Sequence, residues 1–191
     1  AAYLETARAA ATTPLHGVYF LQPLAIEMVG LLVNCVVANG RFEICSSEDD
    51  AFTSALVHSS GALAISGGQQ RIDGASLGTH HFRAAVVGPM YDGFNSIGLE
   101  YGPGYRTLVR VWGGMNDASA RLRARATHEG TQVHPADLDD ALCMSALVTS
   151  SSDETRLPFA VEDALLHGAP GELLAVRCSV AACCPRRLIS V

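Results

Sequence analysis

Lysine is absent from this 191-residue chain, and charged residues of any kind are sparse. All 13 basic residues are arginines, charged residues make up 17% of the chain, and the formal net charge is −6. The arginines are scattered, apart from the alternating Arg121, Arg123 and Arg125, and they form no basic patch of the kind that attracts nucleic acid. We therefore expect no nucleic-acid partner.

Long hydrophobic runs and targeting segments are also missing. The longest apolar stretch, residues 21–37, is interrupted by four residues, namely Gln22, Pro23, Glu27 and Asn34. A membrane-spanning helix needs about 20 consecutive apolar residues, so this stretch predicts buried strands and no membrane association. No basic segment followed by an apolar run and a small-residue cleavage site can be drawn, so a secretory route is unsupported and a cytoplasmic protein is expected.

Paired metal-ligand spacings are absent as well. The six cysteines stand at positions 35, 45, 143, 178, 183 and 184, without a Cys-x-x-Cys pair or neighbouring histidines that could hold zinc. Cys178, Cys183 and Cys184 form the single cluster in the sequence. Cys183 and Cys184 are consecutive, and consecutive cysteines seldom chelate one metal. We expect reduced, structural thiols and no metal site.

Apolar residues, in contrast, are plentiful. Hydrophobic residues make up 49% of the chain and the mean hydropathy is +0.22, which suffices for one sizeable core or two small ones. Residues 1–11 are rich in alanine and other helix formers and are followed by Thr12, Thr13 and Pro14. This pattern predicts a helix. Because no N-cap residue precedes it, the given sequence is expected to start inside this helix or at its first turn.

Two hairpins are expected after this helix. Asn39-Gly40 lies between two short runs of β-branched and aromatic residues, which is a strong signal for a type I′ turn. Ser59-Ser60-Gly61 is predicted to form a second turn, between strands at 55–58 and 62–65.

The rest of the chain repeats the order of helix and strands. Residues 66–80 are rich in Gly, Ser and Gln, which predicts a linker with a domain boundary there or shortly after. Beyond it we expect a helix at 134–147 and strands at 118–126, 157–161 and 173–180. The segments at 82–87 and 107–112 are expected to be strands or helix edges that flank a glycine-rich turn. Such an order is typical of two similar α+β units in tandem.

One glycine-rich segment carries a first motif. Residues 98–108 read GLEYGPGYRTL. Taken alone, Tyr101, Gly102, Pro103 and Tyr105 could be a Gly-Pro turn with two packed tyrosines. The segment resembles the G-x-x-Y-G-P-x-F-x-x-L motif of dehydratase domains of modular polyketide synthases, with Tyr105 in place of Phe.

The predicted helix at 134–147 carries a second motif. Residues 134–139 read HPADLD, and they resemble the H-P-A-L-L-D helix start of the same family. An acidic helix start by itself is more often a solvated face that complements the helix dipole. The resemblance places the catalytic aspartate at Asp139 rather than Asp137 or Asp140, with His134 as a supporting residue.

Two further segments complete or depart from the resemblance. Leu157-Pro158-Phe159, followed by Gly168, is similar to the L-P-F segment of the family, where a tryptophan commonly follows. The residue four after the aspartate is usually Gln or His, which faces the aspartate one helical turn away. Here it is Cys143, a poor substitute, so either another group such as Tyr101 orients the carboxyl group or activity is weak or absent.

The catalytic base of the family is a histidine in an H-x-x-x-G-x-x-x-x-P motif. The family residues that follow that motif are similar to residues 1–5, so the given sequence is expected to begin just after it. The histidines of this chain lack that context, and His58 is assigned to packing and hydrogen bonding.

The resemblance implies an α+β double hot-dog fold, in which two tandem units each wrap a sheet around a central helix. Residues 1–75 would form a first unit that lacks its first strand, and residues 76–191 a second unit with both motifs. The implied enzyme is a hydro-lyase that converts a 3-hydroxyacyl chain into an enoyl thioester without a cofactor. The substrate is carried on the phosphopantetheine arm of an acyl carrier protein, and the expected partners are that carrier, neighbouring synthase domains and a second copy in a homodimer.

Two other functions remain open at this stage. The chain could be a catalytically silent dehydratase-like domain kept for architecture or carrier docking, an alternative raised by Cys143 and the missing histidine. It could also be a related hot-dog enzyme, such as a double-bond isomerase or a product-template cyclase, which would use the same pocket for other proton transfers.

Overall fold

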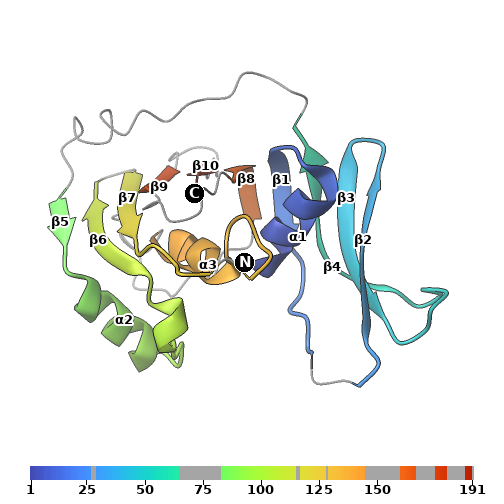
Figure 1. Ribbon diagram of the computed structural model, residues 1–191, viewed down its shortest axis with the longest axis horizontal. Helices are drawn as coiled ribbons and strands as arrows, with labels where there is room; N and C mark the ends of the chain where they lie inside the picture. The colour runs from blue at the N-terminus through green and yellow to red at the C-terminus, as the bar shows by residue number, and fades with distance from the viewer. Residues whose placement is uncertain are drawn as a thin grey trace.

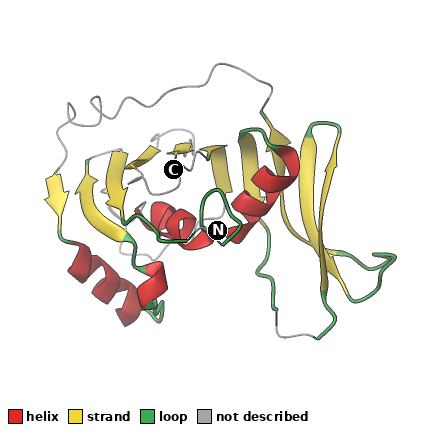
Figure 2. Cartoon of the chain, in the orientation of Figure 1, coloured by secondary structure: helices red, strands yellow, loops and turns green. Residues whose placement is uncertain are grey.

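Strands from the beginning to the end of the chain form one sheet, which is wrapped around two helices (Figures 1 and 2). The computed structural model describes residues 1–26, 29–64, 83–114, 117–127, 129–144, 160–166, 175–179 and 188–190. Ten strands of these residues follow each other across the sheet in the order β2-β3-β4-β1-β8-β10-β9-β7-β6-β5. Neighbouring strands are antiparallel except β8 and β10, which pair in parallel.

The elements have the following bounds. The strands are β1 Leu15–Phe20, β2 Leu32–Ala38, β3 Arg41–Ser47, β4 Leu56–Leu63, β5 Arg83–Ala85, β6 Leu108–Gly113, β7 Asp117–Leu122, β8 Ala160–Leu165, β9 Ala175–Ser179 and β10 Leu188–Ser190. The helices are α1 Ala2–Ala11, α2 Val87–Ser96 and α3 Pro135–Cys143, with a 3-10 turn η2 at Pro103–Tyr105. None of these helices is long and apolar enough to cross a membrane.

The first predicted hairpin is confirmed. Strands β2 and β3 pair in register up to Ala38 and Arg41, and the connecting Asn39 and Gly40 have φ angles of 50° and 71°. Two successive positive φ angles are what a type I′ turn requires, and Asn and Gly tolerate them best. Helix α1 is also confirmed, and it ends as predicted, with Thr12 in the left-handed region at φ 56°.

The second predicted hairpin is wrong. Residues 56–63 form one strand, β4, which lies between β1 and β3 and pairs with both. Because hydrogen-bonded neighbours flank it on each side, the serines stay extended, and the Ser59 hydroxyl donates to the Tyr19 carbonyl at 2.9 Å. Gly61 serves close packing rather than a turn, since a Cβ there would lie 2.6 Å from the ring of Phe42.

Helix α2 was not predicted, because Gly88, Pro89 and Gly93 argue against a helix in sequence. The proline is tolerated because it lies in the first turn, where its missing N–H costs no hydrogen bond. Tyr91 is the buried residue of this helix, and α2 contacts β6.

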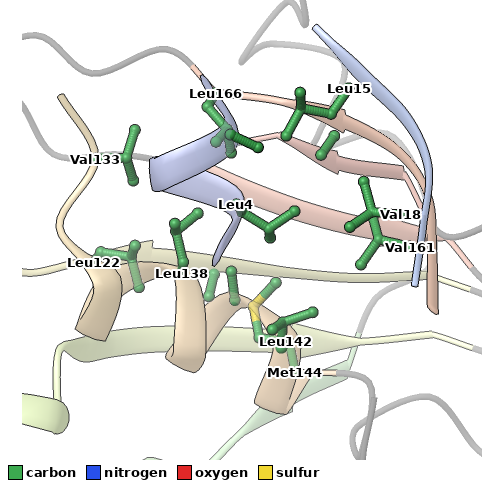
Figure 3. Close-up of a cluster of buried hydrophobic side chains, with 14 of the residues drawn as sticks. Leu4, Leu15, Val18, Leu122, Val133, Leu138, Leu142, Met144, Val161 and Leu166 are labelled. Atoms are coloured by element: carbon green, nitrogen blue, oxygen red, sulfur yellow. The ribbon is translucent and has the colours of Figure 1, made fainter. Parts of the chain in front are cut away.

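Helices α1 and α3 pack against each other inside the sheet, with the N-terminus close to α3 (Figure 1). Leu4 of α1 is fully buried, and it lies between Leu138 and Leu142 of α3 on one side and Val18 and Val161 of two strands on the other (Figure 3). Leu138, Val18 and Val161 are also fully buried. One apolar core therefore joins residues from both ends of the chain.

The described residues include only some of the remaining predicted elements. Helix α3 begins one residue after the predicted start, and β5, β6, β7, β8 and β9 overlap the five predicted segments, although 123–126 are not strand. The linker at 66–80, the boundary at 75/76, the L-P-F segment at 157–159, Gly168 and Cys183-Cys184 lie outside the described residues.

Candidate active site

Helix α3 begins with a histidine cap. The His134 Nδ1 atom accepts a hydrogen bond from the Ala136 N–H at 3.1 Å, and Pro135 takes the first helical position. Its Nε2 atom lies 3.5 Å from a carboxylate oxygen of Glu129. His134 thus orients the start of the helix.

Asp137, in the first turn of α3, is neutralised by an arginine. The Arg125 Nε atom lies 2.9 and 3.0 Å from the two Asp137 oxygens, and a terminal nitrogen of Arg125 donates to the Gly104 carbonyl at 3.0 Å. Asp137 is 4% exposed. This pair fastens the start of the helix to the turn at 103–105, and Asp137 is a structural carboxylate.

Asp140 is the most buried acidic residue described, with no exposed surface. Its Oδ1 atom accepts a hydrogen bond from the Tyr91 hydroxyl at 2.7 Å. Its Oδ2 atom accepts from the Thr107 N–H at 2.6 Å and from the Thr107 hydroxyl at 2.5 Å. These bonds join α3 to α2 and to the residue before β6.

Asp139 is in a different environment. It is partly buried, and its described hydrogen-bond partner is the Tyr101 hydroxyl. Burial raises the pKa of the Asp139 carboxyl group, and the hydrogen bond from Tyr101 only partly offsets this. A raised pKa favours the protonated acid, which can donate a proton.

Cys143 lies one turn after Asp139 and shares its tyrosine. The Cys143 Sγ atom and the Tyr101 hydroxyl oxygen are 3.0 Å apart, and the hydroxyl also contacts Asp139. Burial raises the pKa of the Cys143 thiol to about 12, so the group is a neutral thiol near pH 7. The site therefore brings together Asp139, Tyr101 and Cys143, three of the residues predicted from sequence.

Gly102 and Pro103 fix the position of Tyr101. They begin the turn η2, in which the Tyr105 N–H donates to the Gly102 carbonyl at 2.9 Å. The Arg106 Nε atom donates to the Tyr101 carbonyl at 2.8 Å. The Y-G-P motif thus places its tyrosine over α3, while the glycine and proline shape the backbone.

The ring of Tyr101 packs against two aromatic side chains of α2. The ring of Phe94 meets it edge-on at a centroid distance of 5.5 Å, and the ring of Tyr91 lies at 5.9 Å. Edge-to-face contacts of this kind hold a ring in one orientation. Helix α2 therefore supports the hydroxyl that contacts Asp139.

The start of α1 lies at the same site. Ala1 is half-buried, and its backbone nitrogen is within electrostatic range of the Asp139 carboxyl group and the Cys143 thiol. The fold therefore brings the start of α1 close to Asp139, although the two are far apart in the sequence.

His58 has a structural role, in agreement with the sequence assignment. It is 2% exposed, its Nδ1 atom lies 3.1 Å from the Pro23 carbonyl oxygen, and its Nε2 atom lies 2.7 Å from the Ser46 hydroxyl. Because a carbonyl can only accept, Nδ1 carries the proton and Nε2 accepts from Ser46 in the neutral ring. His80, His81, His128 and His167 lie outside the described residues.

Sequence reasoning missed Tyr91, Thr107 and the buried role of Asp140. Thr107 stands inside the Y-G-P segment, but at a position that the motif leaves free. Tyr91 lies on the helix that was not predicted, so no sequence signal linked it to Asp140. Among the described residues, no group of three or more His, Cys, Asp or Glu side chains could hold a metal ion.

The model of a known family matches this part of the molecule. Residues 77–182, more than half of the chain, match the family described as polyketide synthase dehydratase N-terminal domain. The chain belongs to the polyketide synthase dehydratase family. The matched range contains the site residues Tyr101, His134, Asp139 and Cys143, and the family predicted from the motifs is confirmed.

Curated relatives of this dehydratase domain are far longer proteins. It is 27% identical to polyketide synthase PksN of Bacillus subtilis, over 88% of this chain and 4% of that protein. It is 31% identical to polyketide synthase ThaG of Burkholderia thailandensis, over 89% of this chain and 3% of that protein. The chain thus spans only a few per cent of the length of these relatives.

Solved structures of dehydratase domains have the same fold. The erythromycin dehydratase superimposes with a TM-score of 0.75 at 24% identity, covering 95% of this chain and 71% of that one. The dehydratase domain from the CurF module of the curacin polyketide synthase gives a TM-score of 0.74 at 20% identity, covering 95% and 72%. The predicted α+β double hot-dog fold is confirmed, and dehydratase domains of this kind are hydro-lyases.

Proposed function

We propose that this domain dehydrates a 3-hydroxyacyl thioester and that Asp139 is the acid that protonates the departing hydroxyl group. The observation that carries the proposal is the contrast among the acidic residues of α3. Asp137 is paired with Arg125. Burial raises the pKa of both other aspartates, but Asp140 has no exposed surface, whereas Asp139 is only partly buried and lies beside Tyr101 and Cys143. A protonated carboxyl group at this position can act as a general acid.

In this mechanism a base removes the proton from C2 of the acyl chain, next to the thioester carbonyl. The electron pair of that C–H bond forms the C2–C3 double bond, and the C3–O bond breaks. Asp139 gives its proton to the leaving oxygen, and water departs. Tyr101, which contacts the Asp139 carboxyl group, orients the proton toward the hydroxyl group.

The base in this proposal is a histidine of the H-x-x-x-G-x-x-x-x-P motif, which in this family precedes residues similar to 1–5. Two observations support it. The amino group of Ala1 lies within electrostatic range of Asp139, so residues attached to it would enter the site on the side of the acid. His58, in contrast, has both ring nitrogens engaged in a buried network.

The partners and the cellular location are also proposed from the family. We propose an acyl carrier protein that presents the substrate on its phosphopantetheine arm, neighbouring synthase domains, a homodimer and a cytoplasmic location. The curated relatives, named as polyketide synthases and far longer than this chain, support the neighbouring domains. We propose that the reaction needs no cofactor, and that the two hot-dog units meet near residues 75 and 76.

Cys143 supports one competing function, a silent dehydratase-like domain. The family usually has Gln or His at this position, and a thiol with a pKa near 12 is a weaker hydrogen-bond donor to Asp139 than an amide. The close contact between Cys143 and Tyr101 argues against it, because Tyr101 retains a contact with Asp139.

The test is mass spectrometry of a 3-hydroxyacyl carrier protein incubated with the domain restored to its natural N-terminus. Loss of one water is expected with the wild-type domain, and a rate lower by about two to four powers of ten with Asp139→Asn. The exposed Asp92→Asn on α2 is the matched control and should react at the wild-type rate. Wild-type turnover by Asp139→Asn would refute the role of Asp139, and a folded domain that releases no water would favour the silent alternative.

An isomerase or cyclase would be recognised in the same assay. A double-bond isomerase moves hydrogen within an enoyl chain, so its product has the mass of its substrate and differs in the proton NMR spectrum. Rapid conversion of an enoyl carrier protein, without water loss from the 3-hydroxyacyl substrate, would contradict the dehydratase proposal.

A further inference from the structure

Arginines gather around the β6–β7 hairpin, and the mechanism above does not use them. Residues 106–125 hold five of the 13 arginines of the chain, at positions 106, 110, 121, 123 and 125, and one acidic residue, Asp117. The chain as a whole is acidic, with a net charge of −6. Arg110 is distant in sequence from the alternating Arg121 and Arg123, so only the fold can bring the three together.

The pairing of β6 with β7 does bring them together. Arg110 and Arg121 lie directly opposite each other across the two antiparallel strands. Their neighbours Val111 and Ala120 are each 1% exposed and face the core, so the two arginines lie on the outer face of the sheet, where both are exposed. Arg123 follows directly after β7 and is exposed too. We call Arg110, Arg121 and Arg123 the arginine cluster.

The arginine cluster carries positive charge that no described carboxylate balances. The ion pairs of the described residues involve Arg8, Arg125 and His134, and none of them involves the cluster. Like charges placed directly opposite each other on neighbouring strands destabilise a sheet. A negatively charged partner would offset this cost.

The cluster adjoins the segment that positions Tyr101. The Arg123 N–H donates to the Thr107 carbonyl at 2.7 Å, and a terminal nitrogen of Arg123 donates to the Arg106 carbonyl at 3.3 Å. Arg106 in turn donates to the Tyr101 carbonyl. A cavity of about 230 Å³ lies at the same place, lined in part by Arg123, Thr107 and the Y-G-P turn. A partner seated on the cluster would therefore lie beside the loop that holds Tyr101.

We infer that the arginine cluster is the docking surface for an acidic protein partner, and that this partner is the carrier protein of the proposed function. The inference rests on that function, because the carrier is the partner that has to approach the site with its acyl chain. Complementary charges across an interface mainly raise the rate of encounter and fix the orientation of the partner. Here that orientation brings the base of the phosphopantetheine arm next to the turn that carries Tyr101.

A second copy of this chain fits the cluster less well. A two-fold interface uses the same surface patch of both subunits, so it would bring two arginine clusters into one contact. Like charges across an interface disfavour association. The position beside the Tyr101 loop also favours a partner that delivers the substrate.

The experiment compares a 3-hydroxyacyl chain on its carrier protein with the same chain on pantetheine, using the domain with its natural N-terminus. Arg121→Glu should raise KM for the carrier-bound substrate about tenfold, and Arg110→Glu combined with Arg121→Glu should raise it further, because steering by charge is lost and then reversed. The rate with the pantetheine substrate, which has no carrier to dock, should change less than about twofold. Arg41→Glu is the matched control, since it makes the same change in net charge at an exposed residue of β3, at the other end of the sheet, and should leave KM unchanged.

Binding of the carrier protein without an acyl chain gives a second readout, by fluorescence anisotropy of a labelled carrier. Wild-type affinity should fall several-fold between about 50 and 500 mM salt, and this dependence should weaken in Arg121→Glu. The variant is expected to fold, because it places opposite charges across the two strands. Unchanged KM and affinity in folded Arg121→Glu and in the double variant overturn the inference. A changed oligomeric state with unchanged carrier affinity also overturns it and assigns the cluster to a second copy.

The two readouts separate this inference from the proposed function. If carrier affinity falls in Arg121→Glu while Asp139→Asn still releases water at the wild-type rate, the docking surface stands and the proposed acid is wrong. If Asp139→Asn is inactive while KM and affinity do not respond to changes at Arg110 and Arg121, the acid is right and the carrier docks elsewhere.

Discussion

Helices α1 and α3 lie side by side inside one sheet, yet they bury their acidic side chains in different ways. Glu5 of α1 is 5% exposed, receives two hydrogen bonds from Arg8 at 2.7 and 2.8 Å, and accepts a third from the Gln132 N–H at 2.7 Å. Asp139 and Asp140 of α3 have hydroxyl and backbone partners, and no described arginine pairs with them.

The difference separates structure from chemistry. A buried carboxylate that faces a guanidinium has its charge balanced and its oxygens occupied by hydrogen bonds, which suits it to a structural role. A buried carboxyl group that faces only hydroxyl groups can keep its proton. Glu5 therefore joins α1 to the segment before α3, whereas Asp139 is free to act on a substrate.

The largest effect is expected at the contact between the two helices. Leu4→Ala should lower the free energy of unfolding by about 2–5 kcal/mol, because it leaves a cavity between α1, α3 and the strands. Leu21→Ala is the control, since Leu21 is 49% exposed, and its effect should stay below about 1 kcal/mol. Chemical denaturation measures both, and equal effects would mean that the two helices do not share a core.

A second experiment compares the acidic residues directly. Glu5→Gln should lower the free energy of unfolding by about 1–3 kcal/mol, since it leaves the partly buried Arg8 without its charge partner. Asp139→Asn should change it by less than about 1 kcal/mol, because it removes a carboxyl group that burial already disfavours.

Exposed Glu43→Gln serves as the control for removing a glutamate charge and should be close to neutral. Denaturation curves of the three variants measure these changes in the free energy of unfolding. A larger loss for Asp139→Asn than for Glu5→Gln would reverse the assignment of structural and chemical roles.

A third experiment addresses the pH dependence of Asp139. The hydrogen bond from Tyr101 lowers the pKa of Asp139, so Tyr101→Phe should raise it. The acid would then stay protonated to higher pH, and the fall in the rate of water loss on the alkaline side should move upward by up to about one pH unit. The maximal rate should drop by about tenfold, because the proton is no longer oriented.

The direction of this shift in the pH–rate profile is the main test of the prediction. Tyr105→Phe, at a partly exposed tyrosine of the same turn, is the control and should leave the profile in place. A shift to lower pH in Tyr101→Phe, or a profile that does not move, would contradict the hydrogen-bond scheme.

The smallest effect is expected at Cys143. Cys143→Gln should raise the rate of water loss a few-fold, because an amide at this position can donate a hydrogen bond to Asp139, whereas the described partner of the thiol is Tyr101. Cys143→Ser, which keeps the size and offers a hydroxyl group, is the matched comparison and should lie between the two. A lower rate for Cys143→Gln, in a protein that is still folded, would mean that the pocket is built around the thiol.

Much of the fold could be predicted from local patterns. Helix α1 and the Asn39-Gly40 hairpin follow from alanine content and from a dipeptide that tolerates positive φ angles, so no distant residue is needed to form them. The predicted turn at residues 59–61 failed because Ser and Gly are common in turns and also fit a central strand. Only the neighbouring strands and the ring of Phe42 show which applies here.

The amino-acid sequence by itself determined the family and the motif residues, because these depend on residue types at fixed spacing along one segment. Asp139, four residues before Cys143, is recognisable in that way. The tertiary structure alone decided which acidic residue of α3 is paired with a cation and which is left to hydroxyl groups. Arg125, Thr107 and Tyr91 come from three other segments, and only folding brings their charges and donors to the helix.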